Sequence, residues 1–321
     1  MSTKFAAIDI GSNSSLLLIL ELSPENIARV VIDTKISTRL SAGAHSGEAI
    51  HDSALQRQFA ALDKFAEVLA RDEVGSVIAC GTQVFRVAAN GPKVAEEISR
   101  RYGWRMDIIS GEREAQLSYR AATTGLKDIT DSRNVIDVGG GSSEVILGAG
   151  DKIAASHSFP VGAVSITEKF DLEAGDRNLA RIDAATFYLY ELFLDDNFAI
   201  QRSRSEAAKS SLIAVGGTAA TLAALKLDQK IFVPGAIHGV QLSKKWIQEQ
   251  IVELFNMDAE DRRKLMPYDP DRADIIVGGA LIIEGLLSAL ERPGLIVSNC
   301  GLRWGLIIDT FPALAGARIE Q

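Results

Sequence analysis

The sequence has few of the residues on which disulfide networks and zinc sites depend. It contains two cysteines, Cys80 and Cys300, and four histidines in 321 residues. Neither cysteine belongs to a Cys-x-x-Cys pair or stands at ligand spacing from a histidine, and the histidines show no spacing typical of a metal site or a catalytic triad. This pattern argues against a zinc site and indicates two reduced thiols in the core.

Long apolar runs and an excess of positive charge are also absent. No segment approaches the ~20 apolar residues needed to cross a bilayer, and the first residues, MSTKFAAIDIG, lack the layout of a signal peptide. We therefore expect a cytoplasmic protein without a membrane partner. The formal net charge is −8, which argues against a DNA-binding protein, so a polyanionic ligand would depend on local basic groups and loop amides.

A segment rich in glycine and serine occurs twice. FAAIDIGSNSSLLLIL at residues 5–20 returns as NVIDVGGGSSEVILG at residues 134–148, with the Asp, Gly and Ser positions at one offset of 128. Each copy has the pattern of a strand, a tight turn and a second strand. Glycines allow a ligand close to the backbone, and successive N–H groups in such a turn favour an anion. The predicted phosphate-binding residues are Gly11, Ser12, Asn13, Ser14, Gly139, Gly140, Gly141 and Ser142.

A second repeat supports a duplicated domain. IACGT at residues 78–82 is matched by IAVGGT at residues 213–218, in the same order and at nearly the same offset. Gly217 and Thr218 of this segment are further candidates for phosphate binding. We predict two related domains, residues 1–125 and 126–303, with a C-terminal helix at 304–321 that packs back on the first domain, and a central cleft between them.

The expected elements of the first half are strands at 4–10, 14–22 and 28–38, a helix at 53–71, a strand at 75–80, a helix opened by Pro92, a strand at 106–109 and a helix at 112–124. The second half repeats this scheme with strands at 134–138, 143–147 and 152–159, a long helix around 176–195 and a strand at 212–215. This order of strands and helices is typical of a ribonuclease H-like domain. The predicted fold class is α/β, with two duplicated ribonuclease H-like domains of the superfamily that includes actin-like ATPases, Hsp70 and acetate kinase.

Five ordered motifs now resemble one family. IDIGSNS, SGEREA, IDVGGGSSE, AVGGT and SNCGLRWG, from Ala7 to Gly305, are similar to the exopolyphosphatase and guanosine pentaphosphate phosphohydrolase (Ppx/GppA) family in its short, two-domain form. The resemblance implies a hydrolase that releases terminal orthophosphate from inorganic polyphosphate. It equally allows a 5′-phosphohydrolase of guanosine pentaphosphate (pppGpp), because the two activities overlap in the family.

Two carboxylates flank the second glycine turn. Asp137 and Glu144 are seven positions apart, so a hairpin would bring both to one loop mouth. Mg²⁺ prefers a few carboxylate oxygens together with waters and phosphate oxygens, so we expect this pair to hold Mg²⁺ or another divalent cation. The alternative is that Asp137 accepts hydrogen bonds from its own loop and Glu144 is a solvated strand residue.

The resemblance also supplies catalytic candidates. The family places its catalytic glutamate directly before the alanine of SGEREA, which maps onto Glu114, with Glu112 as a lesser candidate; a first-turn carboxylate is otherwise an ordinary partner of the helix dipole. Many members carry an acid where this chain has Arg113, which puts the pKa of Glu114 in question. Arg86 resembles the family arginine that contacts the cleaved phosphate, the alternative being a surface arginine.

Other roles stay open at this level. Asp9, the counterpart of Asp137, orients water or metal, or caps its own loop. Two further functions are a noncatalytic sensor that binds pppGpp or ppGpp and an ATP-dependent kinase of the same superfamily. A homodimer is left open, and the apolar helix at 275–290 is either core or interface. The further cations are Lys244, Lys245, Arg272, Arg303 and the run Arg262 to Lys264, which we interpret as a solvated helix face.

Overall fold

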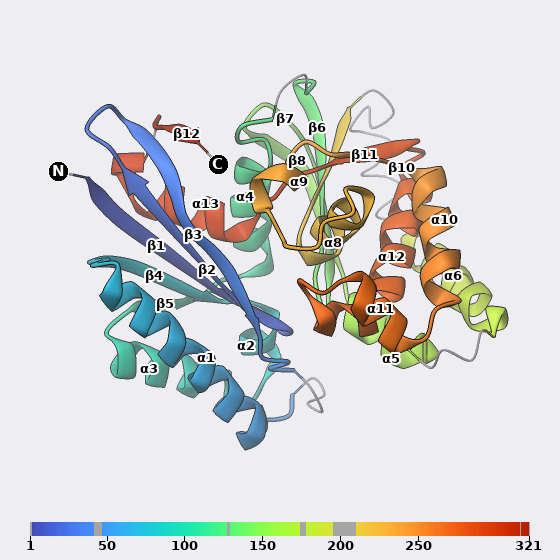
Figure 1. Ribbon diagram of the computed structural model, residues 1–321, viewed down its shortest axis with the longest axis horizontal. Coiled ribbons are helices and arrows are strands. Elements are labelled where there is room, and N and C mark those ends of the chain that lie inside the picture. The colour runs from blue at the N-terminus through green and yellow to red at the C-terminus, as the bar shows by residue number, and fades with distance from the viewer. Residues whose placement is uncertain are drawn as a thin grey trace. The chain divides into compact units, whose positions relative to one another are not determined.

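The computed structural model of the protein describes residues 2–41, 47–126, 129–173, 178–194, 210–314 and 316–320. The chain divides into two units, one made of Met1–Gly125 and Cys300–Gln321 and the other of Leu126–Asn299. Each unit is built around one six-stranded sheet (Figure 1).

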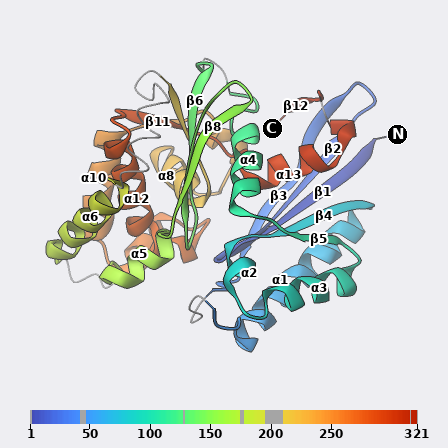
Figure 2. The same cartoon turned by 180° about the vertical axis from the view of Figure 1, so that it is seen from behind.

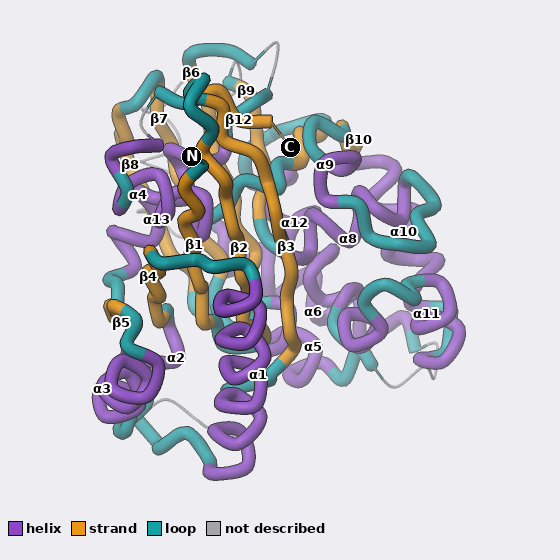
Figure 3. The backbone as a smooth tube through the Cα atoms, turned by 60° about the vertical axis from the view of Figure 1, so that its left-hand side comes forward, coloured by secondary structure: helices purple, strands orange, loops and turns teal. Residues whose placement is uncertain are grey.

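The first unit has its strands in the order β12-β3-β2-β1-β4-β5 (Figure 3). Its elements along the chain are β1 (Thr3–Ile10), β2 (Ser14–Leu22), β3 (Ile27–Ser37), α1 (Asp52–Arg71), β4 (Ser76–Gly81), α2 (Gln83–Val87), α3 (Gly91–Tyr102), β5 (Arg105–Ile108) and α4 (Gly111–Ala122), followed after the second unit by α13 (Leu302–Thr310), a 3₁₀ turn (Pro312–Leu314) and β12 (Arg318–Glu320).

The sheet of the first unit is covered on both faces. Along β1, Ile8 and Ile10 face a core made with α1 and α3, whereas Phe5 and Ala7 face a second core made with α4 and α13. Figure 2 shows these two helix layers on opposite sides of the sheet. Because a central strand buried on both faces needs apolar residues, the run FAAIDI forms the buried part of β1, and Asp9 is the one charged residue within that run.

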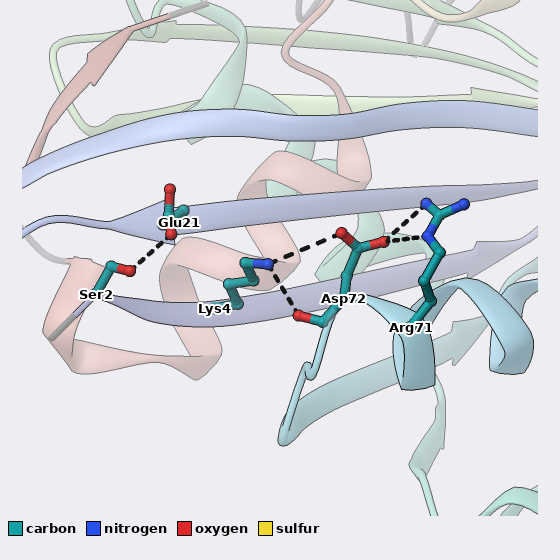
Figure 4. A network of polar contacts seen from close by, with 5 residues as sticks. All are labelled: Ser2, Lys4, Glu21, Arg71 and Asp72. Carbon is teal, nitrogen blue, oxygen red and sulfur yellow. Dashed lines mark hydrogen bonds and ion pairs between the residues drawn. The ribbon is translucent and has the colours of Figure 1, made fainter.

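Polar contacts at the start of β1 hold the end of α1 (Figure 4). Lys4 Nζ donates to the backbone carbonyl of Asp72 at 2.9 Å and lies 3.8 Å from its carboxylate, which also pairs with Arg71 at 2.8 Å. Ser2 donates to Glu21 on β2 at 2.7 Å. These contacts lie at the opposite end of β1 from Asp9, so they support the sheet and leave the turn after Asp9 to other residues.

The second unit has its strands in the order β10-β11-β9-β6-β7-β8. Its elements are β6 (Ser132–Val138), β7 (Ser143–Ala149), β8 (Lys152–Phe159), α5 (Ala163–Phe170), α6 (Leu179–Phe193), β9 (Ser211–Val215), α8 (Gly217–Lys226), α9 (Pro234–Ile237), β10 (Gln241–Ser243), α10 (Lys244–Phe255), α11 (Ala259–Leu265), a 3₁₀ helix (Pro270–Asp274), α12 (Ile276–Ala289) and β11 (Gly294–Val297).

The two sheets share one topology. In each, the first three strands form an antiparallel meander, and the fourth pairs in parallel with the first, as β4 does with β1 and β9 with β6. The predicted α/β fold of two duplicated ribonuclease H-like domains is therefore confirmed. The central cleft and the exact domain limits stay predictions.

Three elements differ from the expected pattern. The helix α5 was not predicted, because its sequence AVSITEKF is rich in β-branched residues and follows Pro160 and Gly162. The expected helix at 176–195 is α6, Leu179–Phe193, and residues 176, 177 and 195 lie outside the described residues. The expected C-terminal helix is the shorter α13, after which the chain forms β12 beside β3.

The most apolar helix, α12, is buried on nearly all sides. It packs against α5, α6, α8 and α10. Of the two interpretations of residues 275–290, core or interface, the structure supports the core. A helix that is apolar all round is typical of a protein interior. Across the described ranges, no helix is long and apolar enough to span a membrane.

Candidate active site

The turn after β1 is closed by one backbone hydrogen bond. Gly11 N donates to Ser14 O at 3.0 Å. The carbonyls of Ser12 and Asn13 accept amides from the segment after β3, which fixes the turn from outside: Ser41 N donates to Ser12 O at 3.0 Å, and Arg39 N donates to Asn13 O at 2.8 Å. The four predicted phosphate-binding residues of this turn are thus held in one rigid loop at the end of the sheet.

Asp9 lies at the base of this turn as a half-buried acid. It is opposite Leu16 on β2 and Cys80 on β4, and its Oδ1 is buried without a hydrogen-bond partner among the described residues. Burial raises the pKa of Asp9 from 3.8 to about 7; the negative charge of Glu114 adds to the rise and Arg303 opposes it. Asp9 therefore does not cap its own loop through Oδ1.

Glu114 is held by a cation. Arg86 of α2 donates from Nη1 to Glu114 Oε2 at 2.8 Å and to the Ile109 carbonyl at 2.8 Å. Ser110 begins α4 by accepting the Arg113 amide at 3.1 Å, so Glu114 falls in the first turn. Burial raises the pKa of Glu114, and Arg86 opposes that rise. Arg86 is thus an ion-pair partner of Glu114, and the alternative of an unpaired surface arginine is wrong.

Three other charged residues of the first unit, Glu112, Arg113 and Arg303, have partners other than Glu114. Arg113 forms an ion pair with Asp309 of α13 and is not among the groups that shift the pKa of Glu114. Glu112 is exposed and accepts a hydrogen bond from Gln116 at 3.3 Å. Arg303 of α13 pairs with Asp33 of β3 at 2.7 Å. Within the first unit, then, Asp9, Glu114 and Arg86 belong together electrostatically and Glu112 does not.

The corresponding turn of the second unit has the same closure. Gly139 N donates to Ser142 O at 3.0 Å, as in the first unit. The start of α5 holds this turn from behind, since Ala163 N donates to Gly139 O and Val164 N to Gly140 O, both at 2.9 Å. The first amides of a helix lack partners inside the helix, and here the carbonyls of the turn supply them.

Asp137 and Glu144 lie directly opposite each other on β6 and β7, so both side chains are on one face of the sheet. Glu144 Oε1 accepts hydrogen bonds from Ser142 Oγ at 2.8 Å and from Ser158 Oγ at 2.9 Å. Glu144 is only 6% exposed, so the alternative of a solvated strand residue is wrong. The corresponding position of the first unit, opposite Asp9, holds Leu16.

A third turn, between β9 and α8, lies beside Asp137. Gly216 has φ of +90°, and a Cβ there would lie 2.4 Å from Asp137 Oδ1, so both the backbone and the space require glycine. A Cβ at Gly217 would lie 2.2 Å from the Arg272 guanidinium. Thr218 is fully buried. The predicted phosphate-binding residues Gly217 and Thr218 are thus close to one carboxylate and one guanidinium.

The acid pair of the second unit fits a magnesium ion by its donor set. The described residues contain no cluster of three or more His, Cys, Asp or Glu side chains that could hold a metal. Mg²⁺ is commonly bound through only one or two carboxylates, with waters and phosphate oxygens completing its shell. Asp137 and Glu144 meet that requirement, and Gly216 packs closely beside the Asp137 carboxylate, where a Cβ would lie 2.4 Å from Oδ1.

Two cationic residues differ from the sequence interpretation. Arg262 is fully buried and donates to the Glu173 carbonyl at 2.8 Å, so the interpretation of Arg262 to Lys264 as a solvated face is wrong at its first position. Arg272 was predicted only as one of several further cations, yet its guanidinium packs on the turn at Gly217. No sequence spacing connects residue 272 with residue 217; the tertiary fold alone joins them.

Several known proteins are similar in sequence to this chain over most of its length. Exopolyphosphatase 2 from Mycobacterium tuberculosis is 30% identical over 303 residues, 91% of this chain and 93% of that protein. A guanosine-5′-triphosphate,3′-diphosphate pyrophosphatase from Photobacterium profundum is 28% identical over 96% of this chain and 59% of its own length. A bifunctional 3-dehydroquinate synthase/phosphatase from Fusobacterium nucleatum is 27% identical over 95% of this chain. The chain spans 46% of that protein's length.

The same comparisons extend to a family and a solved structure. A model of the Ppx/GppA phosphatase family matches residues 19–314. The crystal structure of the Aquifex aeolicus PPX-GPPA enzyme is similar to this chain with a TM-score of 0.75 and 26% sequence identity, covering 96% of this chain and 100% of that one. The resemblance found in the motifs thus extends over nearly the whole chain.

The half-buried Asp9 makes stability depend on pH. Its pKa of about 7 in the folded protein lies above the ordinary value of 3.8, so its contribution to stability is complete below about pH 4 and is lost as pH rises through 7. At 1.36 kcal/mol for each pKa unit, the loss is about 4 kcal/mol. We expect Asp9→Asn to remove this loss and to unfold at a higher temperature than the wild type at pH 8, measured by thermal denaturation with a chelator present.

Asp183→Asn, on the exposed side of α6, is the matched control and should follow the wild-type curve. A constant difference between Asp9→Asn and the wild type from about pH 4 to pH 8 would contradict the assignment of this titration to Asp9.

Proposed function

Because the chain belongs to the Ppx/GppA phosphatase family, as its match over residues 19–314 shows, we propose that it is a metal-dependent exopolyphosphatase. It would release terminal orthophosphate from inorganic polyphosphate by attack of water. The observation that carries this proposal is the half-buried pair of Glu114 and Arg86, joined at 2.8 Å. A half-buried acid beside a positive charge is still reached by water and suits proton removal from water next to a phosphate.

Glu114 is the base in this proposal. The attacking water loses a proton to the Glu114 carboxylate as its oxygen bonds to the terminal phosphorus. The bridging P–O bond breaks, its electron pair stays on the oxygen of the shortened polyphosphate, and the terminal phosphorus with the water oxygen becomes orthophosphate. A base works best when its pKa lies near the working pH, and burial raises the pKa of Glu114 in that direction. Arg86 orients the carboxylate and adds positive charge where negative charge spreads over the phosphoryl oxygens.

The remaining parts of the reaction are binding and charge compensation. The turns at 11–14 and 139–142 offer backbone amides to phosphate oxygens, and Gly217 and Thr218 extend the second of these surfaces. Asp137 and Glu144 would hold Mg²⁺, which when bound neutralises charge on the phosphate oxygens. The two serine hydroxyls on Glu144 fix that carboxylate toward the turn.

The second candidate is a 5′-phosphohydrolase of guanosine pentaphosphate. It is favoured by the similarity to the Photobacterium profundum protein, whose name describes that substrate. In hydrolysis of guanosine pentaphosphate, Glu114 would again activate the water that attacks the terminal phosphate. A relative that the chain matches over 91% of its own length and 93% of the relative's length is called an exopolyphosphatase, and for that reason polyphosphate is our first choice.

A direct comparison of substrates tests that choice. Phosphate release is measured from long polyphosphate, tripolyphosphate and guanosine pentaphosphate, each with a titration of Mg²⁺. We expect kcat/KM to be highest on polyphosphate and release to stop when the metal is chelated. A large preference for the guanosine nucleotide would replace the first candidate by the second, and activity only as transfer to a carbon acceptor would indicate a kinase.

Replacing the base tests the mechanism. Glu114→Gln keeps the size of the side chain but cannot accept the proton, so kcat should fall by about 10²- to 10⁴-fold in a phosphate-release assay. Glu112→Gln, two residues earlier and exposed, should stay within about twofold of the wild type. Activity of Glu114→Gln equal to that of Glu112→Gln would exclude Glu114 as the base, and a wild type that releases no phosphate would favour the noncatalytic sensor.

The metal assignment can be tested without turnover. Glu144→Gln removes the charge while keeping an oxygen for Ser142 and Ser158, and we expect Mn²⁺ affinity to fall by about 10-fold or more, measured by calorimetry with pyrophosphate present. Glu253→Gln, an exposed residue of α10 in the same unit, is the control and should bind Mn²⁺ as the wild type does. Unchanged affinity in Glu144→Gln would remove Glu144 from the metal site.

A further inference from the structure

Two adjacent glycines lie in the first turn of the buried helix α12. Gly278 and Gly279 are its third and fourth residues, within IVGGALIIEGLLSA. Glycine is among the least favourable residues for a helix interior, so a packing reason is expected. The neighbours of these two residues supply one, because each glycine faces a different helix that adjoins a predicted phosphate-binding turn.

Gly278 faces α5. A Cβ at this position would lie 2.4 Å from Thr167 Oγ1 and 2.6 Å from Ile166 Cγ2, which is closer than non-bonded atoms approach. The first turn of α5 donates to the carbonyls of Gly139 and Gly140 at 2.9 Å. Any displacement of α5 away from α12 is therefore transmitted to the turn at 139–142 through two backbone hydrogen bonds.

Gly279 faces α8. A Cβ here would lie 2.6 Å from both Oγ1 and Cγ2 of Thr218, the second residue of that helix. The turn preceding α8 contains Gly216, which has no room for a side chain beside Asp137 Oδ1. A shift of α8 would therefore move this turn against the Asp137 carboxylate.

The contacts of α12 with α5 and α8 are steric rather than polar. The hydroxyls Thr167 Oγ1 and Thr218 Oγ1 are both buried and have no hydrogen-bond partner within the described part of the chain. No hydrogen bond of these hydroxyls therefore fixes the helix spacing, and the absence of a Cβ at the two glycines sets it. Successive residues on a helix point about 100° apart, so one short segment of α12 reaches both helices.

We propose that Gly278 and Gly279 are positioning residues that set the spacing between the turns at 139–142 and 216–218. The proposal rests on the proposed function only in taking these turns to bind phosphate. A methyl group at either glycine separates one turn from the other without changing any group that would touch the ligand, so phosphate binding weakens although every binding group is retained.

The same helix provides a matched control. Gly285 is also within α12, and a Cβ there would lie 2.9 Å from Phe193 Cε2 and 3.1 Å from Phe193 Cδ2. Phe193 belongs to α6, which packs against α12 and α5 and contains no predicted phosphate-binding residue. Gly285→Ala thus crowds the same buried helix against α6 instead of against α5 or α8, and it serves as the control for the effect of crowding on stability.

The experiment compares Gly278→Ala, Gly279→Ala and Gly285→Ala in the full chain. Tripolyphosphate binding is measured by calorimetry and turnover by phosphate release, with thermal denaturation of each variant. We expect the Kd for tripolyphosphate to rise at least about 10-fold in the first two variants and to stay within about twofold of the wild type in Gly285→Ala, although all three unfold at lower temperature. Equal Kd values in the three variants would overturn the proposal.

A rescue variant separates positioning from a general loss of structure. Gly279→Ala would meet both Oγ1 and Cγ2 of Thr218. Thr218→Ser removes Cγ2, one of these two contacts, so Gly279→Ala should weaken binding less in the Thr218→Ser background than in the wild type. An equal loss in both backgrounds, or failure of the double variant to fold, would overturn the steric account of Gly279.

Tripolyphosphate binding and hydrolysis by the wild type show whether this proposal or the proposed function has failed. Binding of tripolyphosphate without hydrolysis would refute the phosphatase mechanism and leave the Kd comparison intact. Hydrolysis with unchanged Kd and kcat in Gly278→Ala and Gly279→Ala would support the phosphatase and refute the positioning role. A wild type that does not bind tripolyphosphate would refute both.

Discussion

One backbone hydrogen bond closes the turn after the first strand of each unit, and the placement of the candidate residues depends on it. Gly11 N to Ser14 O and Gly139 N to Ser142 O are both 3.0 Å. Each bond continues an antiparallel ladder, so the residue at the end of the first strand lies opposite a fixed residue on the second. Asp9 is set opposite Leu16, and Asp137 opposite Glu144. A shift of register by one residue would turn these acids to the other face of the sheet.

The duplicated scaffold carries two different electrostatic environments. In the first unit the acid stands opposite an apolar residue and is half-buried, so its pKa rises to about 7 and Glu114 acts on it as a neighbouring charge. In the second unit the acid stands opposite another carboxylate, which two serine hydroxyls hold in place. The first arrangement favours proton transfer, and the second favours a cation. The difference arises from one position of the repeat, Leu16 in one copy and Glu144 in the other.

Much of the fold could be predicted from the sequence because its signals are local. The Asp-Gly-Ser segments mark both hairpins, and the apolar runs around them mark strands buried on two faces. The two incorrect predictions have a different origin. The β-branched sequence of α5 hides a helix that holds the turn at 139–142, and charge alone made Arg262 look solvated although its guanidinium is buried. Both errors concern segments whose state is fixed by packing against distant parts of the chain.

The sequence by itself determined the duplication, the two glycine turns, the family and the identity of the acids, since each of these is written in the order and spacing of residues. Only the tertiary structure decided that Arg86 pairs with Glu114, that Arg272 packs on Gly217, and that Gly278 and Gly279 face two different helices. The physical reason is that these contacts join residues far apart in the chain. They arise when helices pack on a sheet, and no periodicity of the sequence records which side chains then meet.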